Sequence, residues 1–282
     1  MDPALDAKPE LHSSTSTEHP GPIASARLNT PDTLSVAARR PLFREGDQPE
    51  HIHMLLSGMA CRFRTRRDGG RQIIAFLFPG DFCDLQLFGR SEYAVSTLNV
   101  CKFALFSRAH LADLAEQDTG LALTLLREST REASAMCEWL VTAGSGKAER
   151  QMAHLFCEMH TRLGGWGDAG PITYSLPLTQ ADVADALGLS PVHVNRVLMV
   201  LRKRGLVSWS AGALTILDIH GLEAVAEFNP AYLQSRERTA ISRVALQNAM
   251  TRQHGEIANQ HRCQPDRTED GIATEGTIPT AA

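Results

Sequence analysis

The chain has 282 residues, of which 43% are hydrophobic, and a formal net charge of −4. It is long enough to bury a full core, and its length predicts about two domains. The slightly acidic balance does not exclude nucleic-acid binding, which depends on where Lys and Arg cluster. The sequence has no run of 18 apolar residues and no basic start followed by an apolar core, so we expect a cytoplasmic protein without a membrane span.

The cysteines are spread singly, without a CxxC pair or a metal-ligand spacing of Cys and His. This pattern gives no support to a zinc ribbon or a clustered iron–sulfur site, and we expect no metal. Most of them lie among apolar neighbours, so each is interpreted as a small core residue in a reducing compartment. The six are Cys61, Cys83, Cys101, Cys137, Cys157 and Cys263.

Residues 1–30 are rich in Ser, Thr, Pro and His and are expected to be disordered. Over residues 31–118, short β-branched and aromatic runs alternate with turn pairs such as Pro79-Gly80, which predicts an antiparallel β-barrel or sandwich. Strands are expected over residues 51–56, 59–65, 72–78 and 100–106. A short helix follows Ser107, its expected N-cap.

A hairpin is expected to turn at Asp68-Gly69. Before this turn, Arg62, Arg64 and Arg66 alternate along one strand and therefore share a face. Such a face can hold a phosphate, but we favour a solvated strand edge, because charged edges block aggregation.

A long helix is expected over residues 119–142, and with the hinge that follows it makes up residues 119–144. One stripe of this helix has the alternating three- and four-residue spacing of a coiled-coil seam, which predicts a homodimer. The seam consists of Leu123, Leu126, Thr130, Ala133, Cys137 and Leu140. A second stripe of Leu121, Leu125 and Trp139 lies beside it. A helix buried on both faces within one large core is the alternative.

Gly144-Ser145-Gly146 is the expected hinge, followed by a helix over residues 147–163. The sequence from Leu178 to Trp209 then predicts a helix-turn-helix. Thr179 is an N-cap, Gly188 ends the first helix, and Ser190-Pro191 begins the second. An ordinary helical hairpin with a solvated charged face is the alternative.

Residues 206–217 predict a tight hairpin around Ser210-Ala211-Gly212, the wing of a winged helix-turn-helix that spans residues 145–228. A short closing helix is expected to be capped by Asp218. Residues 229–282 are expected to be a mostly disordered tail with one weakly amphipathic helix near residues 235–253.

This order of elements, with AERQMAHLFCEMHTRL and LPLTQADVADALGLSPVHVNRVLMVLRKRGLVSW, resembles the cyclic-AMP receptor protein / fumarate-nitrate regulator superfamily of bacterial transcription factors. The resemblance covers roughly residues 34–228. It implies an α+β fold with an N-terminal jelly-roll barrel like that of cyclic-nucleotide-binding domains, a dimerisation helix and a C-terminal winged helix-turn-helix. The expected partners are double-stranded DNA, a second copy of the chain and, for an activator, RNA polymerase.

The second helix of the motif is similar to the family's recognition helix, and Arg196 matches its arginine near bases and backbone. Arg196 can pair with guanine O6 and N7, and Val192 can touch a thymine methyl. Pro191 and Val192 stand where the family often has charged base readers, so the operator sequence is left open. The expected DNA-binding residues are Thr179, Gln180, Ser190, Pro191, Val192, His193, Asn195, Arg196, Arg202 and Lys203.

The barrel departs from the family's cyclic-nucleotide binders, which have Gly-Glu for the ribose and an arginine for the cyclic phosphate. Here the two places hold Cys83-Asp84 and Glu92-Tyr93-Ala94, and a phosphate would meet the like charge of Glu92. We expect no cyclic-AMP response, no cofactor and an unknown ligand. The candidate pocket residues are Phe82, Cys83, Asp84, Arg90 and Tyr93. Haem sensing would rest on His51 or His53, which are better explained as surface or structural residues.

The sequence therefore predicts a homodimeric DNA-binding regulator whose operator is a palindrome. Two other classes stay open. One is a sensory module that acts through protein partners without binding DNA. The other is an enzyme with an appended helix-turn-helix, although we find no catalytic constellation in the barrel region.

Overall fold

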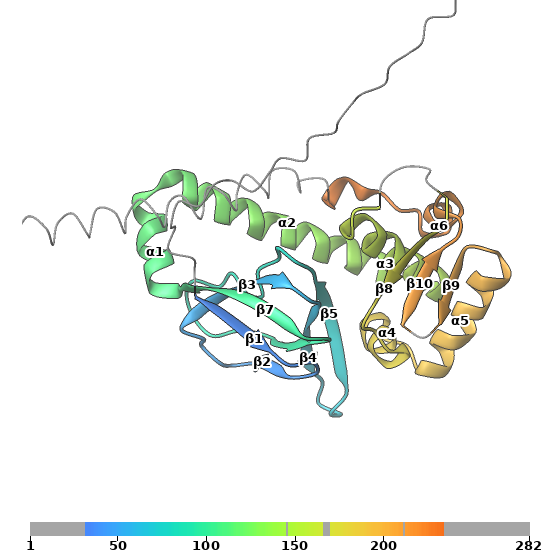
Figure 1. Cartoon of the computed structure of the whole chain (residues 1–282), viewed down its shortest axis with the longest axis horizontal. Coiled ribbons are helices and arrows are strands. Elements are labelled where there is room, and N and C mark those ends of the chain that lie inside the picture. Colours follow the sequence, from blue (N-terminus) through green and yellow to red (C-terminus); the bar gives the residue numbers. More distant parts are fainter. Residues whose placement is uncertain (1–31, 145, 166–169, 211, 234–282) are drawn as a thin grey trace, which may run out of the picture. The chain divides into compact units, whose positions relative to one another are not determined.

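The computed structural model describes residues 32–144, 146–165, 170–210 and 212–233. The N-terminal strands in this part of the chain form two antiparallel sheets, ordered β1-β7-β3 and β2-β6-β4-β5 (Figure 1). The strands are β1 (Thr33–Val36), β2 (Pro41–Phe43), β3 (His51–Ser57), β4 (Ala60–Thr65), β5 (Arg71–Leu77), β6 (Ala94–Thr97) and β7 (Cys101–Ser107). The expected fold class is confirmed, with two sheets in place of one closed barrel.

The hairpin between β4 and β5 turns where the sequence predicts it. Gly69 has φ +81°, a left-handed conformation that glycine adopts without strain, and the Gly70 amide donates to the Asp68 carboxylate over 2.8 Å. The strands β1, β2 and β6 were not predicted. They have three or four residues each, too few for a clear alternation of apolar and polar positions.

Helices α1 (Arg108–Gln117) and α2 (Thr119–Gly144) follow the sheets. Ser107 caps α1 as expected, its hydroxyl accepting from the His110 amide. The inner face of α2 is buried at Leu121 and Leu125, which join an apolar cluster with Phe82 and other residues of the sheets. The long helix therefore covers the N-terminal core with one stripe of its side chains.

The C-terminal part contains α3 (Ala148–Arg162), α4 (Gln180–Leu187), α5 (Pro191–Lys203) and α6 (Ile219–Ala226), then a 3-10 turn η1 (Pro230–Leu233). A three-stranded sheet ordered β8-β10-β9 packs with them: β8 (Ile172–Ser175), β9 (Val207–Ser210) and β10 (Ala213–Ile216). The wing hairpin is present, and Asp218 caps α6 as expected. Strand β8 was missed, because its four residues are stabilised by pairing with β10, about 40 residues later in the chain.

The expected tails, residues 1–30 and most of 229–282 with the helix near 235–253, lie outside the described residues. So do Ser145 of the predicted hinge and Cys263. No described helix is long and apolar enough to cross a membrane. Cys61, Cys83, Cys101 and Cys157 are buried as expected.

Candidate nucleic-acid interface

Local sequence fixes the two helices of the motif. Thr179 and Asp182 form a capping box at the start of α4, and Gly188 ends that helix in a left-handed conformation with φ +66°. The Ser190 hydroxyl accepts from the His193 amide at the start of α5, and Pro191 takes the first helical position, where an N–H is not needed. These caps set the frame in which the side chains of α5 are presented.

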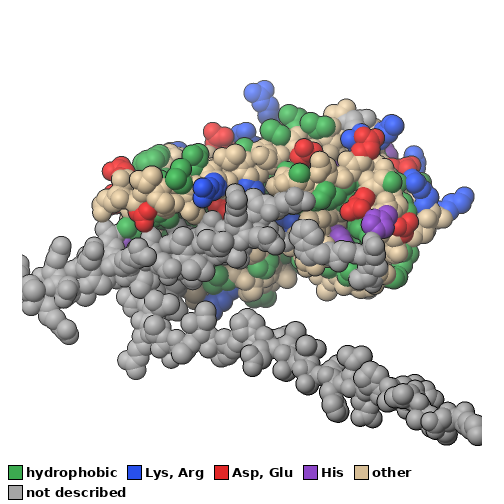
Figure 2. All heavy atoms as spheres, turned by 90° about the horizontal axis from the view of Figure 1, so that it is seen from above, with side chains coloured by type: hydrophobic (Ala, Val, Ile, Leu, Met, Phe, Trp, Pro, Cys, Tyr) green, Lys and Arg blue, Asp and Glu red, His purple; other side chains and the backbone are tan. Residues whose placement is uncertain are grey.

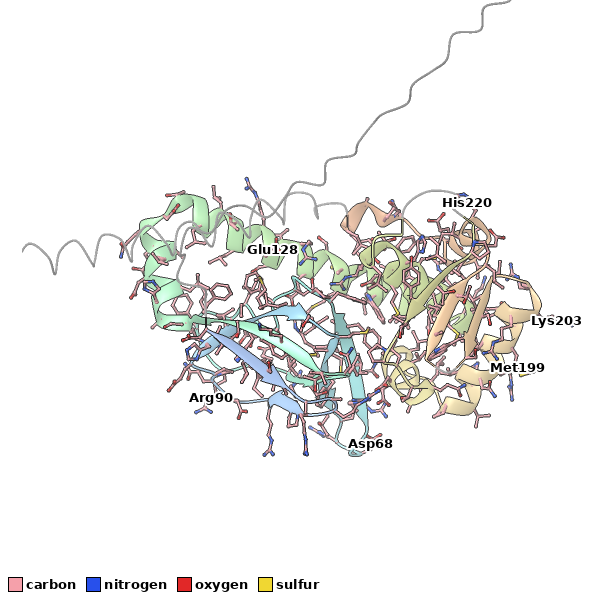
Figure 3. All side chains as sticks on the ribbon, viewed as in Figure 1. Asp68, Arg90, Glu128, Met199, Lys203 and His220 are labelled. Atoms are coloured by element: carbon pink, nitrogen blue, oxygen red, sulfur yellow. The ribbon has the colours of Figure 1, made fainter. Side chains whose placement is uncertain are left out.

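One side of α5 packs into the core of the C-terminal part through Val194, Val197, Leu198 and Leu201. The other side faces solvent. All ten residues predicted to contact DNA are exposed, at the N-terminus of α4, in the turn and on the outer side of α5. In Figure 3, Met199 and Lys203 lie on this outer side. The predicted DNA contacts therefore all lie on exposed parts of the helix-turn-helix.

Positive charge gathers around this helix. Arg202 and Lys203 lie in its last turn, and exposed Lys and Arg side chains project at the end of the molecule that carries α5 (Figure 2). Lys147 and Arg150 were not singled out from the sequence. They lie at the start of α3 and line a hollow together with His193 and Arg196. The packing of α3 against α5, two helices distant in sequence, places them there. Glu149 lines the same hollow, and Arg150 is paired with Glu227 over 2.9 Å.

The outer stripe of α2 is exposed in the single chain. Leu126 is 61% exposed and Leu140 is 74% exposed. All six seam residues, Leu123, Leu126, Thr130, Ala133, Cys137 and Leu140, are exposed. Cys137 was also expected to be a core residue of its own chain, and that expectation is wrong, because its position on α2 faces away from the sheets.

The candidate ligand pocket is only partly assembled. Phe82, Cys83 and Asp84 are buried, and the Tyr93 hydroxyl donates to the Asp84 carboxylate over 3.3 Å. The second oxygen of Asp84 has no hydrogen-bond partner among the described residues, so it keeps an acceptor. Arg90 is exposed, donates to the Gly46 carbonyl, and lies at the periphery in Figure 3.

Arg62 corrects the expectation of a solvated arginine face. Its side chain is buried and donates to the carbonyls of Cys83 and Phe82 over 2.7 and 2.8 Å, with an ion pair to Glu132 of α2. Arg64 is exposed, as expected. The first half of β4, with Arg62, is buried and its last residues are exposed, and Glu132 of α2 lies over the guanidinium of Arg62. The expectation failed because the sequence of the strand does not show that a helix covers this end of it.

Beside Arg62 lies a buried cluster of charges, which we call the junction network. It joins Asp81, after β5, to Glu128 and Arg131 of α2 and Glu158 and Arg162 of α3. Burial opposes the charge of Arg162, but the carboxylates of Asp81 and Glu158 outweigh it and raise the pKa of the guanidinium. In Figure 3, Glu128 lies on the side of α2 that faces the sheets.

The indole N–H of Trp139 and the hydroxyl of Tyr232 also donate to the Glu158 carboxylate, over 2.6 and 3.1 Å. The cavity that the junction network lines measures about 50 Å³. Pockets that hold small molecules are several times larger, roughly 300 Å³ or more. The space therefore suits water.

A second set of contacts joins α4 to β5, through Arg71, and to the turn between β1 and β2, through Arg39. Arg39 and Arg71 both contact the Asp182 carboxylate, over 2.9 and 2.7 Å, and Arg71 also reaches Asp185 over 2.8 Å. Burial opposes the charge of Asp182, but hydrogen bonds from Thr179 and from the arginines hold the pKa of this carboxyl below its usual range. Asp182 thus both caps α4 and holds it to the sheets.

A cyclic nucleotide does not fit the residues present. A cyclic phosphate needs a cation, yet the guanidinium of Arg62 is committed to two carbonyls and Glu132. The exposed Glu92 occupies the position expected for the phosphate arginine. Among the described residues no group of three or more His, Cys, Asp and Glu is placed to hold a metal ion.

Two sheets of jelly-roll type, a long helix and a winged helix-turn-helix with an exposed basic face define a DNA-binding regulator with a sensory domain. Comparison with known families agrees. The Crp-like helix-turn-helix domain matches residues 150–225, and the cyclic nucleotide-binding domain matches residues 33–118. The chain belongs to the Crp/Fnr family of DNA-binding transcriptional regulators.

Relatives in sequence include the nitrogen fixation regulation protein FixK of Bradyrhizobium diazoefficiens, 28% identical over 66% of this chain and 78% of its own length. The transcriptional activator protein FnrL of Cereibacter sphaeroides is 27% identical over 62% of this chain and 71% of its own. The structure of FixK2 from Bradyrhizobium japonicum superposes with a TM-score of 0.63 at 24% identity, over 69% of this chain and 96% of that one. The two sequence relatives are named as regulators, one a nitrogen fixation regulation protein and the other a transcriptional activator.

Proposed function

We propose that the protein acts as a homodimer that binds a two-fold symmetric operator without a cyclic nucleotide. The observation that carries the dimer is the division of α2 into two faces. Leu121 and Leu125 are buried in the chain's own core, while the apolar seam with Leu126 and Leu140 is exposed. A second α2 packed on this seam buries it.

A dimer with two-fold symmetry presents two copies of α5. Helix-turn-helix dimers place their recognition helices about 34 Å apart, so the half-sites lie one helical turn apart as a palindrome. Because DNA is the partner, we place the protein in the cytoplasm. RNA polymerase is the further partner if the protein activates transcription.

The Leu126→Glu variant tests the dimer. A carboxylate in the seam meets its symmetry mate in a desolvated interface, so we expect monomers by light scattering and at least a tenfold weaker gel shift on promoter fragments. Ser129→Glu is the matched control, since it adds the same charge to an exposed flank of the same helix. A Leu126→Glu protein that stays dimeric would remove the seam from the proposal.

Two observations support the proposal that DNA binding needs no cyclic nucleotide. The guanidinium of Arg62 already donates to the carbonyls of Cys83 and Phe82, and the cavity at the junction network is small. We expect the affinity for DNA to be the same with and without 1 mM cyclic AMP, a concentration on the order of weak-ligand dissociation constants. A shift in affinity or in melting temperature on adding the nucleotide would contradict this part.

A further inference from the structure

The outermost line of α5 has a chemical pattern that the helix-turn-helix frame does not require. At 100° per residue, the direction opposite the buried side chains of α5 is occupied by Val192, Arg196, Met199 and Lys203, spaced four, three and four residues apart. All four are exposed. Apolar and cationic side chains therefore alternate along the part of the helix that projects furthest from the core.

The two apolar members are strongly exposed, Val192 at 73% and Met199 at 61%. Single exposed apolar residues are ordinary on protein surfaces. Here, however, two lie on one line and are interleaved with cations, while Val194, Val197, Leu198 and Leu201 of the same helix are buried. The occupant that suits such a line has negative charge and small apolar groups at regular spacing.

The major groove of DNA has this chemistry. Phosphates line its edges, guanine presents O6 and N7 to an arginine, and the thymine C5-methyl is the apolar group displayed on its floor. Lys203, in the last turn of α5, is placed for a phosphate. Arg196 is placed for a guanine, which leaves the methyl groups as partners for Val192 and Met199.

The spacing matches base-pair steps. Val192 precedes Arg196 by four residues, about 6 Å along the axis, and Met199 follows it by three, about 4.5 Å. Base pairs are stacked about 3.4 Å apart, so each apolar side chain is one to two base pairs from the guanine. The unbranched, flexible Met199 has the longer reach, which suits its place further from the N-terminal end that enters the groove.

We propose that Val192 and Met199 are specificity-determining residues that recognise thymine methyl groups on either side of a guanine contacted by Arg196. The inference rests on the proposed binding of α5 in the major groove and names the bases that it selects. Val192 has no donor or acceptor on its side chain. It therefore selects by contact with a methyl, and a cytosine at that place offers none.

The test removes single methyl groups from DNA. An operator is first selected with the full-length protein from a pool with a randomised half-site, and affinities are then measured by fluorescence anisotropy. Replacing thymine by deoxyuridine at the Val192 position deletes only the methyl. Burial of one such group is worth roughly fourfold in affinity, so we expect about a fifteenfold loss when both half-sites are changed.

The Val192→Ala variant, measured on the thymine and the uracil operators, completes a double-mutant cycle between this side chain and the methyl group. This variant should bind the thymine operator about as weakly as the wild type binds the uracil operator, and should not distinguish the two. Met199→Ala should do the same at the other thymine and leave the Val192 position unaffected. Both residues are exposed, so melting temperatures should stay at the wild-type value. Uracil at a thymine outside the half-site core is the control for altered DNA shape.

The outcomes separate the two proposals. Failure to select any sequence would overturn the proposed operator binding itself. A selected operator without thymine within two base pairs of the guanine, or equal wild-type affinity for thymine and uracil, would overturn methyl recognition and leave operator binding standing. Loss on uracil substitution that persists in Val192→Ala would assign the methyl to another residue and also overturn the inference.

Discussion

The outer face of α5 and the junction network both carry charged side chains, but those of α5 are exposed to solvent and those of the junction network are paired with one another. On α5, Arg196 and Lys203 are exposed and project away from the core. In the junction network, Asp81 and Arg162 are bound to each other and to further charges. The first region is available to a partner, whereas the second holds the sheets, α2 and α3 together.

The difference between these two regions shows which charged side chains of the chain are bound within the protein and which are available to another molecule. The charges of a sensory pocket that takes a ligand must be available to that ligand. Here Arg62 is bonded to Cys83, Phe82 and Glu132, so the chain itself satisfies the cation at the junction of the sheets and α2. Of the two regions, the outer face of α5 is the one whose cationic side chains are exposed.

The largest expected effect comes from breaking the junction network. Arg162→Met leaves the buried carboxylates of Asp81 and Glu158 short of a counter-charge, and removing one partner of a buried pair costs about 3–5 kcal/mol. We expect this loss in the free energy of unfolding, measured by urea denaturation followed by circular dichroism. Arg64→Met, which removes an exposed partner of Glu45, should leave the unfolding curve unchanged. Equal losses in the two variants would contradict a structural role for the network.

Substitutions on the outer face of α5 should weaken DNA binding and leave the free energy of unfolding unchanged. Arg196→Ala should cost about 1–3 kcal/mol of binding to the specific operator and relax the preference at one base pair, with no change in urea denaturation. Lys203→Ala is the control, since loss of a phosphate contact weakens binding to every sequence alike and lowers the salt slope by about 1. If Arg196→Ala weakened specific and scrambled DNA equally in competition assays, its assignment to a base would be wrong.

The outer face of α5 could be predicted from the sequence more fully than the junction network could. In the helix-turn-helix, the caps at Thr179, Ser190 and Gly188 are local, and a regular helix then fixes which side chains face outward. The exposed face of α5 could be read residue by residue for this reason. The bases that α5 contacts could not be predicted, because Pro191 and Val192 stand where the family often has charged residues that contact bases.

The sensory region was harder, because its arrangement depends on long-range pairing. Arg62 alternates along β4 with exposed arginines, but it is buried and paired with Glu132 of α2, 70 positions later in the chain. The bonds from Arg39 and Arg71 to Asp182 join residues more than 100 positions apart. Local periodicity carries no information on such contacts, so the junction between the sheets and the C-terminal helices emerged only from the structure.

A smaller effect, on pH dependence, distinguishes a structural histidine from a ligand-binding one. His53 lies between the rings of Phe43 and Phe103. Burial, with the nearby charges of His51 and Arg108, lowers its pKa to about 4 from the ordinary 6.5. The unfolded chain therefore takes up a proton from pH 6.5 downward while the folded protein does not, and stability falls as the pH drops from 6.5 to 4.

For this one group the loss between pH 7 and pH 5 is about 2 kcal/mol. We expect His53→Phe to flatten the pH dependence of urea denaturation over that range by about this amount. The lowered pKa values of His154 and His160 keep their own share of the slope in the variant. His220→Gln is the control, because this side chain is 69% exposed, and it should leave the slope as it is. An unchanged slope in His53→Phe would mean that His53 is protonated in the folded protein, which would reopen this part of the sheets as a site for an anionic ligand.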